Sequence, residues 1–331
     1  MKVSPLLALS ILSFTSASAF TSWLATSKQK FDNIMSNRVA TATTNAIETS
    51  ESSGILTEEQ IQIFERDGVL LVRGLINGEE LRAAIEEVSL IGSKKSPFFK
   101  SYKNIEFQAW RNSKALKDVA IFSKVPRAAA QLINLKSSGK NSKGPIRLLK
   151  DAVLCFSPDG AGCGWHVDDK FFWPCHNDFT GVNVWIALSP MSAERGGGLA
   201  VSPGSHKEKF AQNAIPIIVA GGTCAMETLA PAVHKKLEDM KVVYDMEPGD
   251  AIIHDRWLFH RSDSFKKTEA EDVVLNRYSI RYMSEDARAY DNGFDPVFKD
   301  EKHKGKDGHP LKSFEGFFPQ VFPSAIASEI N

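Results

Sequence analysis

The spacing of hydrophobic residues changes along the chain, from a helical period before residue 147 to short strand-like runs after it. The capping box Thr57–Gln60, apolar Ile61 and Phe64 and the closing Gly68 together predict one short amphipathic helix. The apolar run Val69–Val72 predicts a buried strand. The folded part of the chain is therefore expected to begin with a helix and a strand in direct succession.

Two further helices are expected before the strands begin. Asn77 is the predicted N-cap of the first, whose apolar stripe consists of Leu81, Ala84, Ile85 and Val88. The segment from Leu116 to Leu135 predicts the second, which is either interrupted or started afresh at Pro126.

Beyond Arg147, short apolar runs alternate with clusters of Gly, Pro and Asp, a pattern typical of strands and turns. Several strands preceded by helices predict a mainly β fold with flanking helices, a β-sandwich or jelly roll. The predicted strands are Ala152–Phe156, Val182–Leu188, Val242–Tyr244, Ala251–Ile253 and Arg277–Met283.

Composition and charge exclude several classes of protein. Of the 331 residues, 43% are hydrophobic and 24% are charged, which is enough apolar content for a sizeable core. Lys plus Arg and Asp plus Glu both number 40, so no basic excess points to a nucleic-acid binder. No apolar stretch reaches the roughly 20 residues that cross a bilayer, so no membrane span is expected.

The four cysteines include no C-x-x-C pair, so the sequence spells out neither a zinc ribbon nor a thioredoxin-type motif. A bridge between Cys163 and Cys175 is compatible with the sequence. Thiols packed in the interior are the favoured interpretation.

The N-terminus has the pattern of a targeting sequence. Lys2, the apolar run Val3–Phe14 and the small residues Ser16–Ala19 predict a cleavable signal peptide over residues 1–19. Residues 20–54, which begin with Phe20 and are rich in Ser, Thr and Ala, form a transit peptide or linker. They resemble the presequence of algae with complex plastids, such as diatoms, in which Ala-Phe marks the signal-to-transit junction. That resemblance implies a plastid location, although three acidic residues lie in the segment; secretion is the alternative.

The sharpest chemical signal lies in the folded domain expected at residues 55–331. His166 and Asp168 are two residues apart, and in a strand such residues project from the same face and can jointly hold one ion. His260 follows a Gly-Asp turn and an apolar strand, and supplies a third ligand. Two imidazoles and one carboxylate on one side of a metal leave positions open for substrates, which is the ligand set of non-heme Fe(II) oxygenases.

From about Ile55 to its C-terminus the chain resembles the phytanoyl-CoA dioxygenase family of Fe(II)/2-oxoglutarate oxygenases. The resemblance implies a double-stranded β-helix, the cupin-like jelly roll, with Fe(II), 2-oxoglutarate and O₂ as the reactants at the metal. The matching features, in chain order, are Leu56–Gln60 with Phe64 and Asp67-Gly68, His166-x-Asp168, Val184–Leu188, Gly197–Leu199, Pro203–His206, Gly249-Asp250, His260-x-Ser262 and Arg277-x-Ser279.

The family chemistry requires a cation for the distal carboxylate of 2-oxoglutarate, and an arginine fork binds a carboxylate with two hydrogen bonds. Arg277 is the predicted residue, with Arg281 on the same side of the strand as the fallback. Ser262 and Ser279 are expected to add hydrogen bonds, and Trp185 to wall the pocket.

One position departs from the family pattern. A lysine often precedes the proline of the strand before the His-x-Asp motif, whereas this chain has Ser157-Pro158. Lys150 and Arg147 are the candidates to replace that lysine.

Other conspicuous residues receive plainer interpretations. His206, in a family turn, and His254, within a predicted strand, are taken as structural. Phe171–Trp173 belong either to the core or to the wall of a substrate pocket. Gly196–Gly198 lack the context of a phosphate loop and predict a turn between strands.

The expected activity is hydroxylation or desaturation of a small, hydrophobic metabolite, coupled to conversion of 2-oxoglutarate to succinate and CO₂. A plastid location favours a tetrapyrrole, a carotenoid or an acyl lipid as the substrate. The alternatives are a non-oxidative cupin-like metal protein, such as an epimerase or binding protein, and a catalytically silent 2-oxoglutarate sensor. The oligomeric state is left open.

A fluorescent protein fused behind residues 1–55 should be delivered to the plastid when expressed in a diatom. Replacing Phe20 by Ala should divert it, because the signal-to-transit junction is then lost. Fluorescence microscopy distinguishes the two variants. Secretion of the unmodified fusion into the medium would show that the plastid assignment is wrong.

Overall fold

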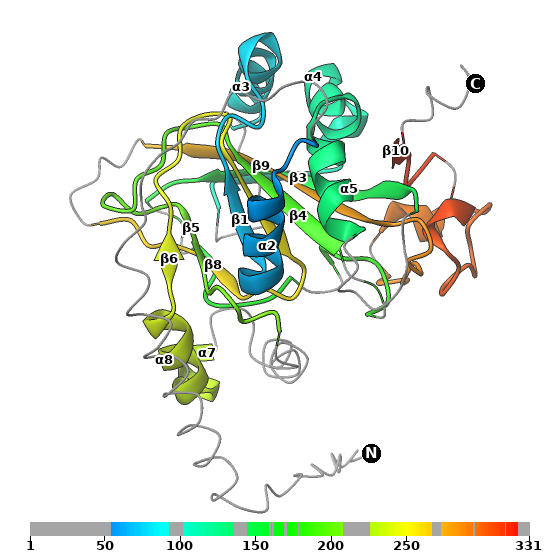
Figure 1. Ribbon diagram of the computed structural model, residues 1–331. Helices are drawn as coiled ribbons and strands as arrows, with labels where there is room; N and C mark the ends of the chain where they lie inside the picture. The colour runs from blue at the N-terminus through cyan, green and yellow to red at the C-terminus, as the bar shows by residue number, and fades with distance from the viewer. Residues whose placement is uncertain are drawn as a thin grey trace, which may run out of the picture. The chain divides into compact units, whose positions relative to one another are not determined.

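The computed structural model describes residues 54–323 apart from 93–101, 135–143, 159, 161, 169–170, 178, 180, 208–225, 267–272, 294 and 315 (Figure 1). The predicted signal peptide, and all but the last residue of the predicted transit segment, lie outside the described residues. The described chain forms two antiparallel sheets with helices beside them. The expected mainly β jelly roll is thereby confirmed.

The larger sheet has seven strands in the order β1-β7-β4-β9-β3-β10, and β2 and β10 pair with different ends of β3. Its neighbours in space are mostly distant in sequence, as the crossovers of a jelly roll require. The strands are β1 (Val69–Val72), β2 (Asn104–Phe107), β3 (Ile146–Phe156), β4 (Gly181–Ala187), β7 (Ala251–Asp255), β9 (Leu275–Ser284) and β10 (Gln320–Phe322).

The smaller sheet has three strands in the order β6-β5-β8. These are β5 (Leu199–Val201), β6 (Val242–Val243) and β8 (His260–Ser262). The short strands β2, β5, β8 and β10 were not predicted, because none of them contains four consecutive apolar residues like those that identified β1.

The helices at the start of the domain follow the sequence signals. In α2 (Glu58–Asp67), Thr57 and Gln60 form the capping box, and Gly68 closes the helix in a left-handed conformation. The predicted third helix is started afresh at Pro126: α4 (Lys114–Lys117) continues into a π-type turn (Asp118–Phe122) before α5 (Val125–Ile133) begins.

The remaining helical segments are α3 (Gly78–Gly92), α7 (Met226–Leu229), α8 (Pro231–Asp239) and three short 3₁₀ turns at Ala109–Arg111, Pro296–Lys299 and Leu311–Ser313. Figure 1 shows α3, α4 and α5 gathered near the larger sheet and α7 and α8 beyond the end of β6. Among the described residues, no helix is long and apolar enough to cross a membrane.

Side chains along β9 alternate between two environments. Tyr278, Ile280 and Tyr282 belong to the core that the larger sheet shares with α2, α3 and α5. Ser279 and Arg281 point to the opposite side, where they line a cavity. This alternation assigns one side of the sheet to packing against helices and leaves the other for polar chemistry.

The described cysteines are not bridged. Cys155, Cys163 and Cys175 are free thiols, and Cys155 and Cys175 are buried. The interpretation of thiols packed in the interior is confirmed for Cys155 and Cys175, whereas Cys163 is only partly buried, and the Cys163–Cys175 bridge is not formed.

A buried carboxyl group ties β3 to β9 on the helical side of the sheet. Tyr278 donates a 2.6 Å hydrogen bond to Asp151, and the main-chain N–H of Trp110 donates to the same oxygen at 2.9 Å. Burial raises the pKa of Asp151 to about 6, against these hydrogen bonds, which lower it. The carboxyl group is therefore ionised in mildly alkaline solution, and it depends on its donors.

Tyr278→Phe should lower the free energy of unfolding at about pH 8 by about 1.5–3 kcal/mol, because it removes a donor from a buried carboxylate. Tyr282→Phe is the matched control. Its hydroxyl donates at 2.7 Å to the carbonyl oxygen of Ala120, so its loss should cost only about 0.5–1.5 kcal/mol. Urea unfolding measures both, and a larger loss in the Tyr282 variant would contradict a charged Asp151.

Candidate active site

His166 and His260 are placed side by side by a pair of main-chain hydrogen bonds. The amide of each donates to the carbonyl oxygen of the other at 3.0 Å, which forms an isolated β-bridge at the start of β8. Glu238 of α8 holds the flanking residues, accepting from the indole N–H of Trp165 at 2.7 Å and pairing with Arg261 at 3.0 Å. The His-x-Asp motif therefore lies in a loop pinned to β8, not within a strand.

The two imidazoles and Asp168 converge. Their candidate ligand atoms all lie within 4.8 Å of one another, and all three residues are buried. Nδ1 of His166 lies 2.7 Å from the carbonyl oxygen of Gly164, and Nδ1 of His260 lies 3.0 Å from that of Leu258. These carbonyls fix the proton on Nδ1, so each Nε2 carries a lone pair directed at the carboxylate.

This arrangement fits a divalent metal ion. Oδ1 of Asp168 lies 3.7 Å from Nε2 of His166 and 3.6 Å from Nε2 of His260. Outer carbonyls that orient ligating histidines are the usual support of a metal site. The structure thus brings together all three residues that the sequence proposed as metal ligands.

The second oxygen of Asp168 is held from the other side. Arg281 donates to Oδ2 through Nε at 3.0 Å and Nη2 at 2.8 Å, and the indole N–H of Trp173 lies 3.3 Å from it. Burial by itself raises the pKa of Asp168, but the charge of Arg281 outweighs it and holds this pKa well below the ordinary value. Asp168 is therefore ionised at neutral pH.

His254 lies beside the histidine pair without joining it. Its ring centroid is 4.7 Å from that of His260, and its Nε2 is 3.0 Å from the amide nitrogen of Asn183. Asn183 in turn accepts from Ser279 at 2.9 Å. Burial, then the neighbouring His260, lowers the pKa of His254 to about 3, so this imidazole is neutral.

Arg277 is also buried, but the groups around its guanidinium differ from those around Arg281. Its Nη2 donates to the carbonyl oxygen of Gly197 at 2.7 Å, and its guanidinium lies 4.9 Å from the ring centroid of Phe156 and 5.1 Å from that of Trp185. Its Nε has no hydrogen-bond partner, and no carboxylate of the described chain pairs with it. Burial lowers its pKa to about 10, which still leaves it charged at neutral pH.

The turn that supplies this carbonyl requires glycine. Gly196 and Gly197 have φ angles of 82° and 78°, and a Cβ on Gly197 would lie 2.5 Å from the ring of Phe265. The expected turn at Gly196–Gly198 is thus present, and it brings a main-chain acceptor to Arg277.

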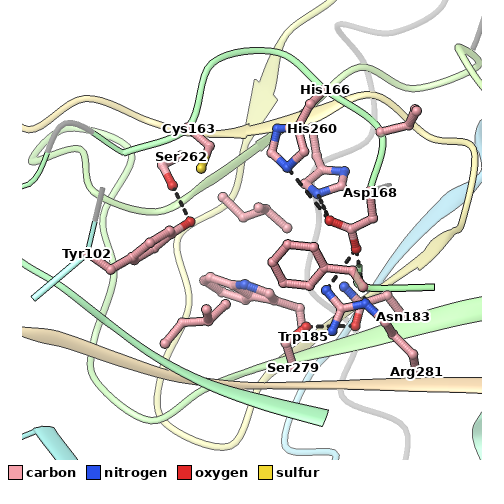
Figure 2. A pocket seen from close by; sticks show the side chains of 14 residues that line it. Tyr102, Cys163, His166, Asp168, Asn183, Trp185, His260, Ser262, Ser279 and Arg281 are labelled. Carbon is pink, nitrogen blue, oxygen red and sulfur yellow. Dashed lines mark hydrogen bonds and ion pairs between the residues drawn. The ribbon is translucent and has the colours of Figure 1, made fainter. Parts of the chain in front are cut away.

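A cavity of about 80 Å³ adjoins the histidines and Asp168, with room for several water molecules (Figure 2). Arg281, Trp185, Ser262 and Ser279 line it, as the sequence analysis expected of a pocket, whereas Arg277 is not among the lining residues. The other lining residues are Tyr102, Leu154, Cys163, His166, Val167, Asp168, Phe172, Asn183, Leu199 and His260.

Tyr102 and Asn183 are cavity residues that sequence reasoning missed. The hydroxyl groups of Tyr102 and Ser262 are 2.9 Å apart, and the guanidinium of Arg277 lies 5.8 Å from the Tyr102 ring. Burial raises the pKa of Tyr102, which stays protonated. Tyr102 precedes an unpredicted strand and had no signal; Asn183 was a polar residue inside a predicted apolar strand and could have been noticed.

The aromatic triplet after the motif divides between the two expected roles. Phe172 lines the cavity, and its ring centroid lies 4.6 Å from the guanidinium carbon of Arg281. Trp173 is fully buried and donates to Asp168. Phe171 accepts at its carbonyl oxygen from Lys150.

The residues considered as replacements for the family lysine do not reach the cavity. Lys150 donates to the carbonyl oxygen of Phe171 at 2.8 Å and pairs with Asp295 at 3.4 Å. Arg147 donates to the carbonyl oxygen of Phe318 and lies 3.6 Å from Glu285. His206, as expected, is outside the cavity; its ring packs against Gly68 at the end of α2.

Comparisons with known proteins agree with this geometry. The model of a family described as phytanoyl-CoA dioxygenase matches residues 64–266. The dioxygenase lolE1 of Epichloe uncinata is 26% identical over 241 residues, which cover 70% of this chain and 86% of that protein. The 1-deoxypentalenic acid 11-beta-hydroxylase of Streptomyces exfoliatus is 24% identical over 212 residues, which cover 61% of this chain and 72% of that protein.

Solved structures share the fold. The non-heme alpha ketoglutarate dependent carbocyclase SnoK from nogalamycin biosynthesis superimposes with a TM-score of 0.60 and 21% identity, over 84% of this chain and all of that one. The epimerase SnoN of the same biosynthesis, also described as alpha ketoglutarate dependent, gives a TM-score of 0.55 and 20% identity over 80% of this chain and 98% of that one.

Asp168→Ala should weaken the binding of Co(II) about a hundredfold or more, since losing even an outer-shell partner of a metal ligand costs about 10–100-fold. His254→Ala is the control. It removes a neutral ring that only packs against His260, so it should cost about tenfold at most. Isothermal titration with Co(II) measures both. Equal and complete loss in the two variants, with the fold intact, would mean that His254 is a ligand.

Proposed function

The chain belongs to the phytanoyl-CoA dioxygenase family, and on that premise we propose that it hydroxylates or desaturates a small, hydrophobic metabolite, with Fe(II), 2-oxoglutarate and O₂ as reactants. The observation that carries the proposal is the convergence of two Nε2 lone pairs and one carboxylate oxygen at a buried point beside a cavity. When bound, iron supplies the activation of O₂ that couples oxidation of 2-oxoglutarate to removal of hydrogen from a C–H bond.

His166, Asp168 and His260 are the residues that hold the metal. The His260 imidazole stays neutral, because burial and then the neighbouring His166 lower its pKa. In both histidines Nδ1 faces a carbonyl oxygen, which leaves Nε2 as the atom available to a metal. The carboxylate stays ionised, because Arg281 stabilises its charge. Asp168 and His260 are thus in the protonation state that a metal requires at neutral pH.

Arg277 is the residue that binds the distal carboxylate of 2-oxoglutarate. Arg281 already directs two N–H groups at Asp168, so it has no free fork for a second carboxylate. Arg277 has an unused Nε, and its guanidinium lies 5.8 Å from the ring of Tyr102, a cavity residue whose hydroxyl is hydrogen-bonded to that of Ser262. Ser262 and Ser279 are further donors, and Trp185 forms the wall against which the co-substrate lies.

The rest of the cavity favours an apolar substrate. Leu154, Val167, Phe172 and Leu199 contribute much of its lining, and apolar walls exclude water from the reacting centre. A tetrapyrrole, carotenoid or acyl lipid of the plastid meets this requirement and agrees with the proposed presequence. Incubation of the enzyme with a plastid extract, followed by mass spectrometry of the depleted metabolite, identifies the substrate.

Removal of hydrogen from a C–H bond is also the first step of reactions other than hydroxylation. The structural neighbours SnoK and SnoN are described as a carbocyclase and an epimerase. The product distinguishes these outcomes. Hydroxylation adds one oxygen atom, desaturation or ring closure removes two hydrogen atoms, and epimerisation leaves the mass unchanged.

The rival proposals are a non-oxidative cupin-like metal protein and a silent 2-oxoglutarate sensor. Succinate formation that requires both Fe(II) and 2-oxoglutarate supports the oxygenase. Binding of 2-oxoglutarate without turnover would favour the sensor, and indifference to 2-oxoglutarate would favour the non-oxidative protein.

Arg277→Lys should raise the concentration of 2-oxoglutarate needed for half-maximal succinate formation about ten- to a hundredfold. Lysine keeps the charge but loses the fork, and a charge-assisted hydrogen bond is worth about 1.5–3 kcal/mol, at about 1.4 kcal/mol per tenfold. Affinity for the metal should stay unchanged, because Arg277 contacts none of the three ligands.

Arg281→Lys is the comparison variant on the same side of β9. Titration with 2-oxoglutarate measures both variants. A shift confined to the Arg281 variant would transfer the co-substrate site to Arg281, and no shift in either would remove the co-substrate assignment.

A further inference from the structure

We propose that Arg281 is a positioning residue that restricts Asp168 to binding the metal through one oxygen, and so keeps the remaining metal positions open. The proposal rests on the metal site proposed above. In this proposal Oδ1 of Asp168 binds the metal, and Oδ2 binds only N–H groups of the protein. No sequence motif specifies this difference between the two oxygens.

The two oxygens of Asp168 face different groups. Oδ1 is the atom near both Nε2 atoms, at 3.7 and 3.6 Å. Oδ2 receives Nε and Nη2 of Arg281 at 3.0 and 2.8 Å, and the indole N–H of Trp173 at 3.3 Å. Three N–H groups therefore saturate the oxygen that points away from the histidines, and Figure 2 shows the carboxylate between the imidazoles and the guanidinium.

Arg281 is itself held rigidly. It lies on β9 between β3 and β4, opposite Lys150 and Asn183 in the two registers. Phe172 covers its guanidinium at 4.6 Å, and only 3% of its side chain is exposed. A cation carried by a central strand and covered by a ring cannot follow Asp168 if the carboxylate turns, so it fixes the carboxylate's orientation.

This restraint matters because a carboxylate beside a hard cation binds through either one oxygen or both. A two-oxygen Asp168 would fill a position that the co-substrates need. Because Oδ2 is bound to Arg281, turning Oδ2 toward the metal would leave the guanidinium without its carboxylate, which is a costly loss for a side chain that is only 3% exposed. The ion pair thus makes one-oxygen binding the stable state.

The test measures the metal site without turnover. Mn(II) is titrated into the full-length protein, and its affinity and the water-proton relaxation rate per bound ion are recorded; the latter counts the water molecules left on the metal. Arg281→Met should weaken Mn(II) binding about 10–100-fold. It should also lower the relaxation enhancement per bound ion by about a third, because a two-oxygen Asp168 displaces one of three waters.

Arg277→Met is the matched control. It removes another buried arginine from the same side of the same strand, so it reports the general cost of such a loss. Its relaxation enhancement per bound ion should equal that of the parent protein. Arg281→Lys, which restores a cation near Oδ2, should recover part of the relaxation that Arg281→Met loses, and Trp173→Phe should lower it less than Arg281→Met does.

The outcomes separate this inference from the proposed function. If the parent protein binds no Mn(II), the metal site itself is wrong. If the parent binds Mn(II) and the Arg281 variants keep its relaxation enhancement per ion, or Arg277→Met loses as much, the positioning role is overturned while the metal site stands. Circular dichroism verifies the fold of each variant. If Arg281→Met does not fold, the other two variants decide the question. The positioning role of Arg281 is overturned if both Arg281→Lys and Trp173→Phe keep the relaxation enhancement per bound ion of the parent protein.

Discussion

The alternation of side chains along β9 is the constraint on which the site depends. Because β9 lies between β3 and β4, each of its residues faces either the helices or the cavity side. Slipping the strand by one residue would send Arg281 into the apolar core and Tyr282 toward the cavity. The hydrogen bond from Tyr278 to Asp151 anchors this register on the helical side. Packing and chemistry are therefore determined by one strand pairing.

The charges of the centre are balanced before any metal arrives. Asp168 is ionised and Arg281 offsets its charge, and burial lowers the pKa of His260 so that this imidazole is neutral. A buried carboxylate without such a partner would be expensive to keep ionised. A divalent ion then adds positive charge to a site in which the charge of Asp168 is already offset by Arg281. A dianionic co-substrate carries the charge that compensates for such an ion.

The sequence was enough to select the three residues that converge at the candidate metal site, because His166 and Asp168 are two residues apart and His260 follows a recognisable strand. It also predicted α2 and β1 with their bounds, from caps and apolar runs. It could not separate Arg277 from Arg281, since both have the same parity on β9. The sequence also could not predict the contacts of Tyr102 with Ser262 and of Trp173 with Asp168, because only the tertiary fold brings these residues together.

The two arginines differ in what neutralises them, and that difference decides their roles. They are four residues apart, which is about 13 Å along an extended strand, so one carboxylate cannot satisfy both. Arg281 meets a carboxylate of the protein itself. Arg277 is supported by aromatic faces, which stabilise a cation without occupying its N–H groups, and by a single carbonyl oxygen. A guanidinium buried in this way retains donors for a carboxylate that comes from outside the chain.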